Sequence, residues 1–259
     1  MQGDIMYLDG YRQWTLGSLY AQFGQVDRAI AVYHQALYSF RQVKDTLNTA
    51  KMLNRLGELY ALRDDLPTTL RLCQAAERLF CQENDLDGAI SALRNVAMVH
   101  YQLQHPEQAI KLLERVLADC DTQGDRFNEA ITLTCLAQVY GSQQQYLFAL
   151  ACQEAALEHF QTVEDLDRID EATYRLALSL CHIGQICVKT GHSDVAIRRY
   201  GEALTIFESA GMSEEILSTL ATLCQLHGQL EQYCQALAYR QRALSYESQV
   251  SEGVRMRFS

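Results

Sequence analysis

The sequence predicts an all-α protein, a solenoid of six helix–turn–helix repeats. The 259 residues include only two prolines, which favours long helices because proline costs about 3 kcal/mol inside one. Columns of small and branched residues recur at steps of 40 residues, with one step of 47. Between the columns, apolar residues recur at three and four, as in Leu53, Leu56 and Tyr60, which is the spacing of an amphipathic helix.

Four columns hold one register through all six units. A branched residue begins each second helix, at Ile30, Leu70, Ile110, Leu150, Ile197 and Leu237. Small residues recur in the first helices, at Gly17, Gly57, Ala97, Ala137, Gly184 and Cys224. The other columns are Ala36, Ala76, Val116, Ala156, Ala203, Ala243 and Phe40, Phe80, Cys120, Phe160, Phe207, Glu247. Self-similarity at this period is typical of a solenoid, and glycine in mid-helix is expected where a second helix approaches closely.

The expected helix pairs follow from this register. In chain order they are 5–23/27–43, 46–63/67–82, 86–103/106–122, 126–143/146–162, 168–190/193–209 and 214–228/232–249. The repeats therefore occupy about 5–44, 45–84, 85–124, 125–164, 165–211 and 212–251, in a single solenoid of residues 1–251 with a short tail at 252–259.

Residues typical of helix starts agree with these boundaries. Aspartates spaced by 40 precede the first helices of repeats two to five, at Asp45, Asp85, Asp125 and Asp165. An aspartate there is expected to cap the helix by accepting backbone N–H groups. Pro67 and Pro106 precede second helices, whose first turn accepts proline.

The step of 47 lies in the fifth repeat. Seven extra residues are close to two helical turns, so the first helix of that repeat can lengthen and keep its buried face. The inserted stretch, residues 164–171, is acidic. We expect a solvated, well-capped helix extension, and the alternative is an acidic knob that touches a basic partner. A calcium loop is excluded because the required glycine and terminal glutamate are missing.

Composition limits the class of protein. The formal net charge of −10 argues against nucleic acid, which attracts a basic face. No apolar run of about 18 residues is present, so no membrane span is expected, and the first residues do not resemble a signal peptide. We therefore expect a cytoplasmic protein. The nine cysteines show no CxxC spacing and are expected to be mostly reduced core thiols, with metal binding or redox sensing as the alternative.

A family resemblance follows from the first two repeats. Leu56-Gly57-x-x-Tyr60 followed by Ala76, and the matching set Leu16-Gly17, Tyr20, Ala29, Tyr33 and Ala36, resemble the tetratricopeptide signature. The period of 40 exceeds the usual 34 and is similar to the longer-helix subclass of kinesin light chains, LGN-like scaffolds and bacterial signalling proteins. The resemblance implies a right-handed α-solenoid. The signature tryptophan is absent from its usual position, with Trp14 displaced by one residue, which weakens any transfer of binding residues.

The resemblance also implies a concave groove lined by the first helices, in which a partner protein or peptide binds. Counting from the Gly/Ala column, the outward positions are polar and carry cations in repeats two and three. The candidate binding residues are Lys51, Asn54, Arg55, Arg94, Asn95, Gln138 and Gln185. Asparagine offers a donor and an acceptor to a peptide backbone, and arginine offers a fork to a carboxylate. We therefore expect an acidic peptide or a C-terminal carboxylate as ligand; the alternative is an ordinary exposed helix face.

The predicted function is a non-catalytic protein-interaction scaffold or adaptor. The alternative is a sensory segment of a larger signalling protein, such as an ATPase, protease or transcription regulator. No catalytic motif is present, and no enzyme activity, cofactor or metal site is expected. An array normally closes with a polar capping helix, and the alternative is that Arg240 and Glu247 already make the last helix polar enough. We therefore expect that the chain continues in a longer protein, or that an uncapped end docks on a partner or on a second copy.

Overall fold

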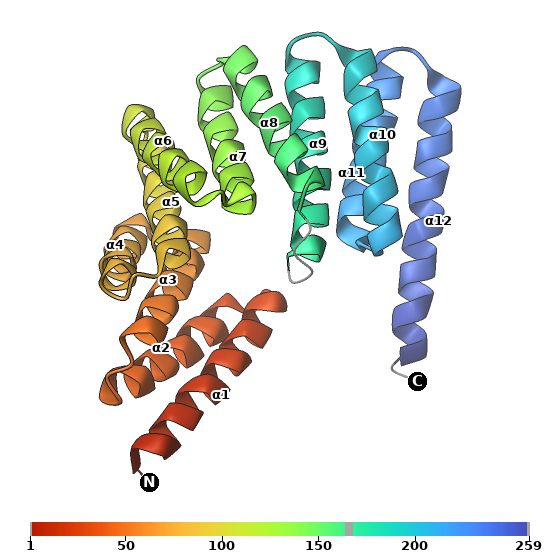
Figure 1. The fold of residues 1–259 in the computed structure, drawn as a ribbon. Coiled ribbons are helices and arrows are strands. Elements are labelled where there is room, and N and C mark those ends of the chain that lie inside the picture. The colour runs from red at the N-terminus through yellow and green to blue at the C-terminus, as the bar shows by residue number, and fades with distance from the viewer. Residues whose placement is uncertain (1, 164–167, 258–259) are drawn as a thin grey trace. The chain divides into compact units, whose positions relative to one another are not determined.

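The computed structural model describes residues 2–163 and 168–257 (Figure 1). Their secondary structure is helical throughout, and consecutive helices pack as antiparallel hairpins, so the predicted all-α class is confirmed. Two compact units, Met1–Cys135 and Leu136–Ser259, divide the chain within α7 (Arg126–Ser142). Each unit is described by itself, and the single solenoid of residues 1–251 stays a prediction.

In the described part of the first unit, six complete helices precede α7. They are α1 (Gln2–Gln22), α2 (Val26–Gln42), α3 (Thr46–Leu62), α4 (Leu66–Gln82), α5 (Leu86–Gln102) and α6 (Pro106–Gln123). The second unit continues with α8 (Tyr146–Gln161), α9 (Ile169–Lys189), α10 (Ser193–Ala210), α11 (Ser213–Gln229) and α12 (Tyr233–Arg257). All bounds lie within three residues of the prediction except the end of α12, which continues past residue 249 into the predicted tail.

The predicted aspartate caps form at three of the four positions. Asp45 accepts from the backbone N–H of Asn48 at 2.9 Å, and Asp85 accepts from that of Gly88 at 3.0 Å. Asp125 likewise accepts from the backbone N–H of Asn128 at 3.0 Å. Asp165 lies outside the described residues. Both prolines occupy the first turns of their helices, α4 and α6, as predicted.

The lengthened first helix of repeat five is confirmed. Helix α9 contains 21 residues, against 17 in α3, α5, α7 and α11. Its first turn is acidic and Glu171 forms an ion pair with Arg175 at 2.6 Å. The preceding residues 164–167 lie outside the described residues, so the choice between a helix extension and an acidic knob remains open for that part.

The small-residue column lies where the two helices of a repeat touch. A β-carbon on Gly17 would come within 2.7 Å of the Tyr33 ring, and one on Gly184 within 2.8 Å of the Tyr200 ring. A β-carbon on Gly57 would overlap the Sγ atom of Cys73. The glycines are therefore needed for close helix approach, as predicted from the column.

The hairpin turns share one backbone device. One residue in each described turn adopts a left-handed conformation with φ between 57° and 82°. Glycine occupies this position in four turns, at Gly24, Gly124, Gly191 and Gly211. The other six turns use Lys44, Asp64, Asn84, Gln104, Gln144 and Glu231, for which the left-handed conformation costs free energy.

The cysteines are less uniformly buried than predicted. Cys73, Cys120 and Cys187 are buried, and burial raises the pKa of the Cys73 thiol to about 12 and that of Cys120 to about 11. Cys81 and Cys234 are exposed, because they lie on outward faces of the second helices α4 and α12. The prediction of mostly core thiols therefore fails for these two.

Candidate partner-binding surfaces

The candidate residues of the first unit lie on neighbouring first helices. Lys51, Asn54 and Arg55 come from α3, and Arg94 and Asn95 come from α5. Helices α3 and α5 contact each other directly. We name the surface formed by Lys51, Asn54, Arg55, Glu58, Ser91, Arg94 and Asn95 the polar patch.

Glu58 is the centre of the polar patch. Its carboxylate accepts from the Arg55 guanidinium at 2.9 Å and from the amide of Asn54 at 3.3 Å, with Asn95 Nδ2 at 3.5 Å. Asn95 also donates to Asn54 Oδ1 at 3.1 Å, and Asn54 donates to Ser91 Oγ at 3.3 Å. The network therefore joins α3 to α5 through side chains alone.

This arrangement changes what each candidate offers a ligand. Asn54 is buried and its amide is engaged within the network, so it supports the patch rather than presenting open donors. The Arg55 side chain is 57% exposed beside Glu58. An exposed ion pair of this kind contributes at most about 1 kcal/mol, so a ligand carboxylate can replace Glu58 as the partner of Arg55 at little cost.

The other two cations of the patch are held by neighbours. The Lys51 ammonium lies 5.9 Å from the centre of the Trp14 ring, within cation–π range. Arg94 donates to Asn128 Oδ1 at 3.3 Å. Both contacts hold a long, flexible side chain in place on the patch.

Two cavities open beside Glu58. The larger, of about 300 Å³, is lined by Ser18, Ala21, Gln22, Tyr33, Arg55, Glu58 and Leu59. The smaller, of about 70 Å³, is lined by Gly57, Glu58, Ala61, Thr69, Asn95, Met98, Val99 and Gln102. An extended chain lying across the patch would thus find space for side chains on both sides of the carboxylate.

The remaining two candidates lie in the second unit. Gln138 is on α7 and Gln185 is on α9, and both side chains are exposed. The five candidates from α3 and α5 therefore share one surface, while these two belong to a unit described by itself. Their role in binding stays a prediction.

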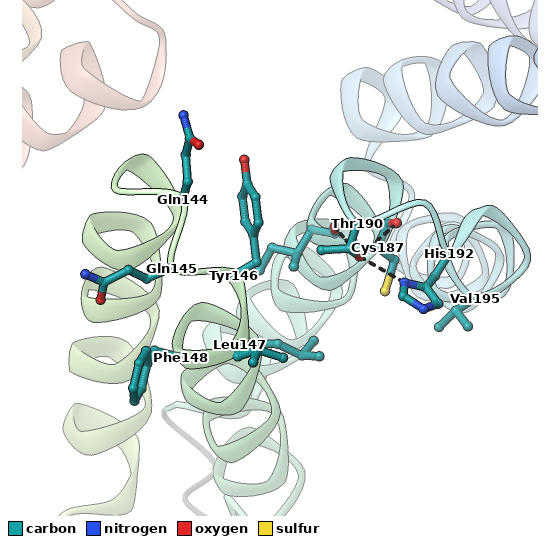
Figure 2. A pocket seen from close by; sticks show the side chains of 11 residues that line it. Gln144, Gln145, Tyr146, Leu147, Phe148, Cys187, Thr190, His192 and Val195 are labelled. Atoms are coloured by element: carbon teal, nitrogen blue, oxygen red, sulfur yellow. Dashed lines mark hydrogen bonds between the residues drawn. The ribbon is translucent and has the colours of Figure 1, made fainter.

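The second unit carries an apolar pocket that the sequence reasoning missed. Its volume is about 570 Å³, and it lies between the start of α8 and the turn from α9 to α10 (Figure 2). Figure 2 shows Leu147 on the α8 side, with Val195 and His192 on the opposite side. Leu147 is 83% exposed and Phe148 is 62% exposed. Exposure of large apolar side chains to water is unfavourable, and adjoining ones often mark a surface that a partner covers.

The polar groups around this pocket are few. His192 Nδ1 lies 3.1 Å from the Thr190 hydroxyl, and Phe148 packs on Tyr140 with ring centroids 5.6 Å apart. Burial raises the pKa of the Cys187 thiol, so it stays neutral. The pocket suits an apolar side chain.

A comparison between repeats shows that the sequence marks this pocket. The second helices begin with equivalent pairs, and each of the other five pairs contains at least one polar residue. These pairs are Asp27-Arg28, Pro67-Thr68, Glu107-Gln108, Asp194-Val195 and Cys234-Gln235. Leu147-Phe148 is apolar at both positions, so repeat four differs from its neighbours at a solvent-facing site.

Within residues 2–163 and 168–257, no helix combines the length and apolar content needed to cross a membrane. The same residues contain no group of three or more His, Cys, Asp or Glu side chains placed to hold a metal ion.

Solved structures similar to this chain are helical-repeat proteins. A Rap protein complexed with competence and sporulation factor has 16% identity and a TM-score of 0.66, over 95% of this chain and 76% of that one. A signal transduction ATPase with a tetratricopeptide repeat sensor from Pyrococcus horikoshii has 17% identity and a TM-score of 0.71, over 95% and 36%. Kinesin light chain-like repeats from Podosopora anserina have 14% identity and a TM-score of 0.56, over 78% and 96%. These likenesses support the tetratricopeptide-type α-solenoid fold.

The family of the chain is shown by comparison with models of protein families. No curated protein sequence matches the chain. Tetratricopeptide-repeat models match residues 48–121 and 128–209, and another matches residues 16–45. The matched segments cover more than half of the sequence and agree with the helical hairpins. The chain therefore belongs to the tetratricopeptide-repeat family.

Proposed function

We propose that this protein is a non-catalytic adaptor that binds an extended segment of a partner protein on the polar patch. The tetratricopeptide fold is generally a non-catalytic interaction scaffold, and the similar Rap structure was solved in complex with competence and sporulation factor. The supporting observation is the Glu58-centred network, which holds Arg55 and Asn95 in place between two cavities.

The charges favour a ligand with a carboxylate. The patch as defined above contains three cations, Lys51, Arg55 and Arg94, and one carboxylate, Glu58. A ligand carboxylate, from an acidic residue or a chain terminus, would exchange with Glu58 on the Arg55 guanidinium. Glu58 would then accept a backbone N–H of the ligand. We propose that this binding takes place in the cytoplasm, in keeping with cysteines that are thiols and not disulfides.

A peptide array with matched free and amidated C termini tests the ligand class. Sequences that bind should lose affinity on amidation if the chain terminus is read, or on Asp→Asn exchange if an acidic residue is read. Binding that is indifferent to both changes would contradict a carboxylate ligand.

Two substitutions with opposite effects test the site. Arg55→Glu should lower affinity at least tenfold, because it puts a second carboxylate where the ligand carboxylate binds. Glu58→Gln should raise affinity about two- to fivefold, since an exposed ion pair of up to about 1 kcal/mol no longer competes. Affinities are measured by fluorescence anisotropy with a labelled array peptide.

Arg199→Glu is the matched control. Arg199 pairs with Glu202 at 3.1 Å, three residues apart on one helix, as Arg55 pairs with Glu58, but it lies on α10. It should leave affinity unchanged. Equal losses from Arg199→Glu and Arg55→Glu would show a general charge effect and would remove the polar patch as the site.

The apolar pocket of the second unit is a second candidate contact for the same partner. Leu147→Glu and Phe148→Gln introduce the residues that repeat three carries at the equivalent positions, Glu107 and Gln108. The exposed side chains should be replaceable without loss of stability, while affinity for a full-length partner should fall. Unchanged partner affinity in both variants would exclude the pocket.

The sensory alternative is favoured by one observation, the fold similarity to a repeat sensor within a signal transduction ATPase, of which this chain covers 36%. A sensor must change conformation on binding its ligand. Small-angle scattering with saturating array peptide separates the two functions: a changed radius of gyration supports a sensor, and an unchanged one supports an adaptor.

A further inference from the structure

Aromatic side chains line the face of α1 that meets the polar patch. Tyr7, Tyr11 and Trp14 are spaced by four and three residues, which places them on one side of the helix. The rings of Tyr11 and Trp14 stack with centroids 5.7 Å apart, and the Tyr7 ring meets that of Tyr11 edge-on at 5.0 Å. The ammonium of Lys51, a member of the polar patch, lies 5.9 Å from the centre of the Trp14 ring. We name Tyr7, Tyr11 and Trp14 the aromatic row; it continues the polar patch onto α1.

The repeat register also places the aromatic row on the same face as the polar patch. Tyr11 is the repeat-one equivalent of Lys51 and Ser91, and Trp14 is that of Asn54. Lys51 and Ser91 remain partly exposed although another repeat precedes each of them, and Tyr11 is 36% exposed. Access to this position in the first three repeats therefore does not depend on which repeat stands first.

The hydrogen bonds of Tyr11 turn its hydroxyl into a donor. Asp45, the cap of α3, accepts from the side-chain amide of Asn48 at 2.6 Å. The same amide donates to the Tyr11 hydroxyl oxygen at 2.9 Å, and the Tyr7 hydroxyl donates to that oxygen at 3.2 Å. A phenol oxygen that already accepts two hydrogen bonds has its own O–H left to give. The Tyr11 hydroxyl is therefore held in place, with its proton directed to a third group.

The surface made by the aromatic row and Lys51 combines apolar rings with hydrogen-bond donors. The indole N–H of Trp14 and the ammonium of Lys51 can only donate, and the bonded Tyr11 hydroxyl donates as well. A peptide that fits this surface must offer carbonyl oxygens and apolar side chains, and it needs few N–H groups. Proline has no backbone N–H, and a polyproline II helix leaves its carbonyls free of internal hydrogen bonds. Such helices dock on aromatic-lined grooves.

We propose that the aromatic row binds a proline-rich stretch of the partner, beside the carboxylate that the polar patch takes. This inference rests on the proposed function and names the segment next to that carboxylate. The proline rings pack on the rings of Tyr11 and Trp14, and a carbonyl of the stretch accepts from the Tyr11 hydroxyl. The carboxylate then reaches Arg55, which lines one cavity together with Ser18 and Ala21 of α1.

The fluorescence of Trp14 tests this proposal directly, because Trp14 is the only tryptophan in the sequence. The probes are short blocked proline peptides that begin or end with aspartate, so that both chain directions are sampled. The matched controls carry alanine in place of proline. The better proline peptide should shield Trp14 from quenching by acrylamide in a saturable way. It should also bind about fivefold tighter than its alanine counterpart, because a polyproline II helix is formed before binding.

Removal of one hydroxyl tests the donor. Tyr11→Phe keeps the ring, so affinity for the proline peptide should fall about three- to tenfold through the loss of one hydrogen bond. Asn48 keeps its hydrogen bond to Asp45 in this variant, and a circular dichroism melt checks that the fold is retained. Tyr38→Phe is the matched control, since it removes a hydroxyl from an exposed tyrosine of α2, and it should leave affinity unchanged. The comparison of proline with alanine peptides needs no variant and stands even if Tyr11→Phe unfolds.

The outcomes separate this inference from the proposed function. Equal affinity for proline and alanine peptides, or no binding of either proline peptide at millimolar concentration, would overturn the proline site. Binding that leaves Trp14 open to acrylamide, or that Tyr11→Phe and Tyr38→Phe weaken equally, would place the peptide elsewhere and would also overturn it. A proline peptide that shields Trp14 but ignores an Asp→Asn exchange would support the aromatic row and contradict the carboxylate of the proposed function.

Discussion

Because α3 and α4 approach closely at Gly57, we expect an alanine substitution there to lower stability, which is the opposite of its usual effect in a helix. In a helix interior, alanine is normally about 1 kcal/mol more stable than glycine. At Gly57 the added β-carbon would overlap Cys73 Sγ, and both residues are buried. Overpacking of this kind costs about 1–3 kcal/mol. Gly57→Ala should therefore destabilise the protein by up to about 2 kcal/mol, although alanine is the better helix former.

Gly201→Ala is the internal control for this reasoning. Gly201 lies within α10, and a β-carbon there would meet no atom within 4 Å. The same substitution should stabilise the protein by about 0.5–1 kcal/mol. Thermal melting followed by far-UV circular dichroism resolves the difference, since 1 kcal/mol shifts the melting temperature of a protein of this size by about 2–4 °C.

A double substitution identifies the atom responsible. Cys73→Ala alone removes a buried Sγ and should destabilise the protein by about 1 kcal/mol. In the Gly57→Ala background, Cys73→Ala should cost less, because it also removes the overlap between the added β-carbon and Sγ. The two substitutions should therefore depart from additivity by about 1–2 kcal/mol. Additive effects, or a Gly57→Ala variant that melts above wild type as Gly201→Ala does, would refute the assigned register of α3 against α4.

Three further predictions concern single side chains. Asp85→Ala should cost about 1 kcal/mol in urea denaturation by removing the α5 cap, and Asp85→Asn should restore most of it. Burial and neighbouring His105 lower the pKa of His100; its contribution to stability is therefore complete above its ordinary pKa of about 6.5 and is lost as pH falls through the lowered value. His100→Gln should flatten the decline of melting temperature below that pH, and an unchanged slope would contradict this assignment. A maleimide should modify exposed Cys81 at least tenfold faster than buried Cys73, as peptide mass spectrometry would show; equal rates would contradict the burial of Cys73.

Much of the fold could be predicted because a repeat presents the same physical requirement six times. The column through Gly57 and Gly184 marks close helix contacts, and Asp45 and Asp85 mark helix starts, so errors at one repeat are corrected by the others. The end of α12 had no such support. It lies beyond the last column residue, and the helix continues to Arg257.

The candidate site was harder to predict because it depends on contacts between helices. The register predicts that Asn54 and Arg55 face outward, whereas Asn54 is buried, and it cannot show that Glu58 accepts hydrogen bonds from both of them and from Asn95. The apolar pocket was missed for a different reason. Leu147 and Phe148 fit a general expectation of apolar residues in helices, and their meaning appears only when the same two positions are compared across all six repeats.

The left-handed turn residues suggest how this protein can be engineered. Six turns place a residue with a side chain, such as Lys44 or Glu231, in a conformation that glycine adopts without steric cost. Replacement by glycine should relieve strain of about 1 kcal/mol at each turn. These positions lie outside the helices, none belongs to the polar patch, and one of them, Gln144, lines the apolar pocket. At the five other turns, thermal stability can therefore be adjusted one turn at a time while the polar patch and the apolar pocket keep their native residues.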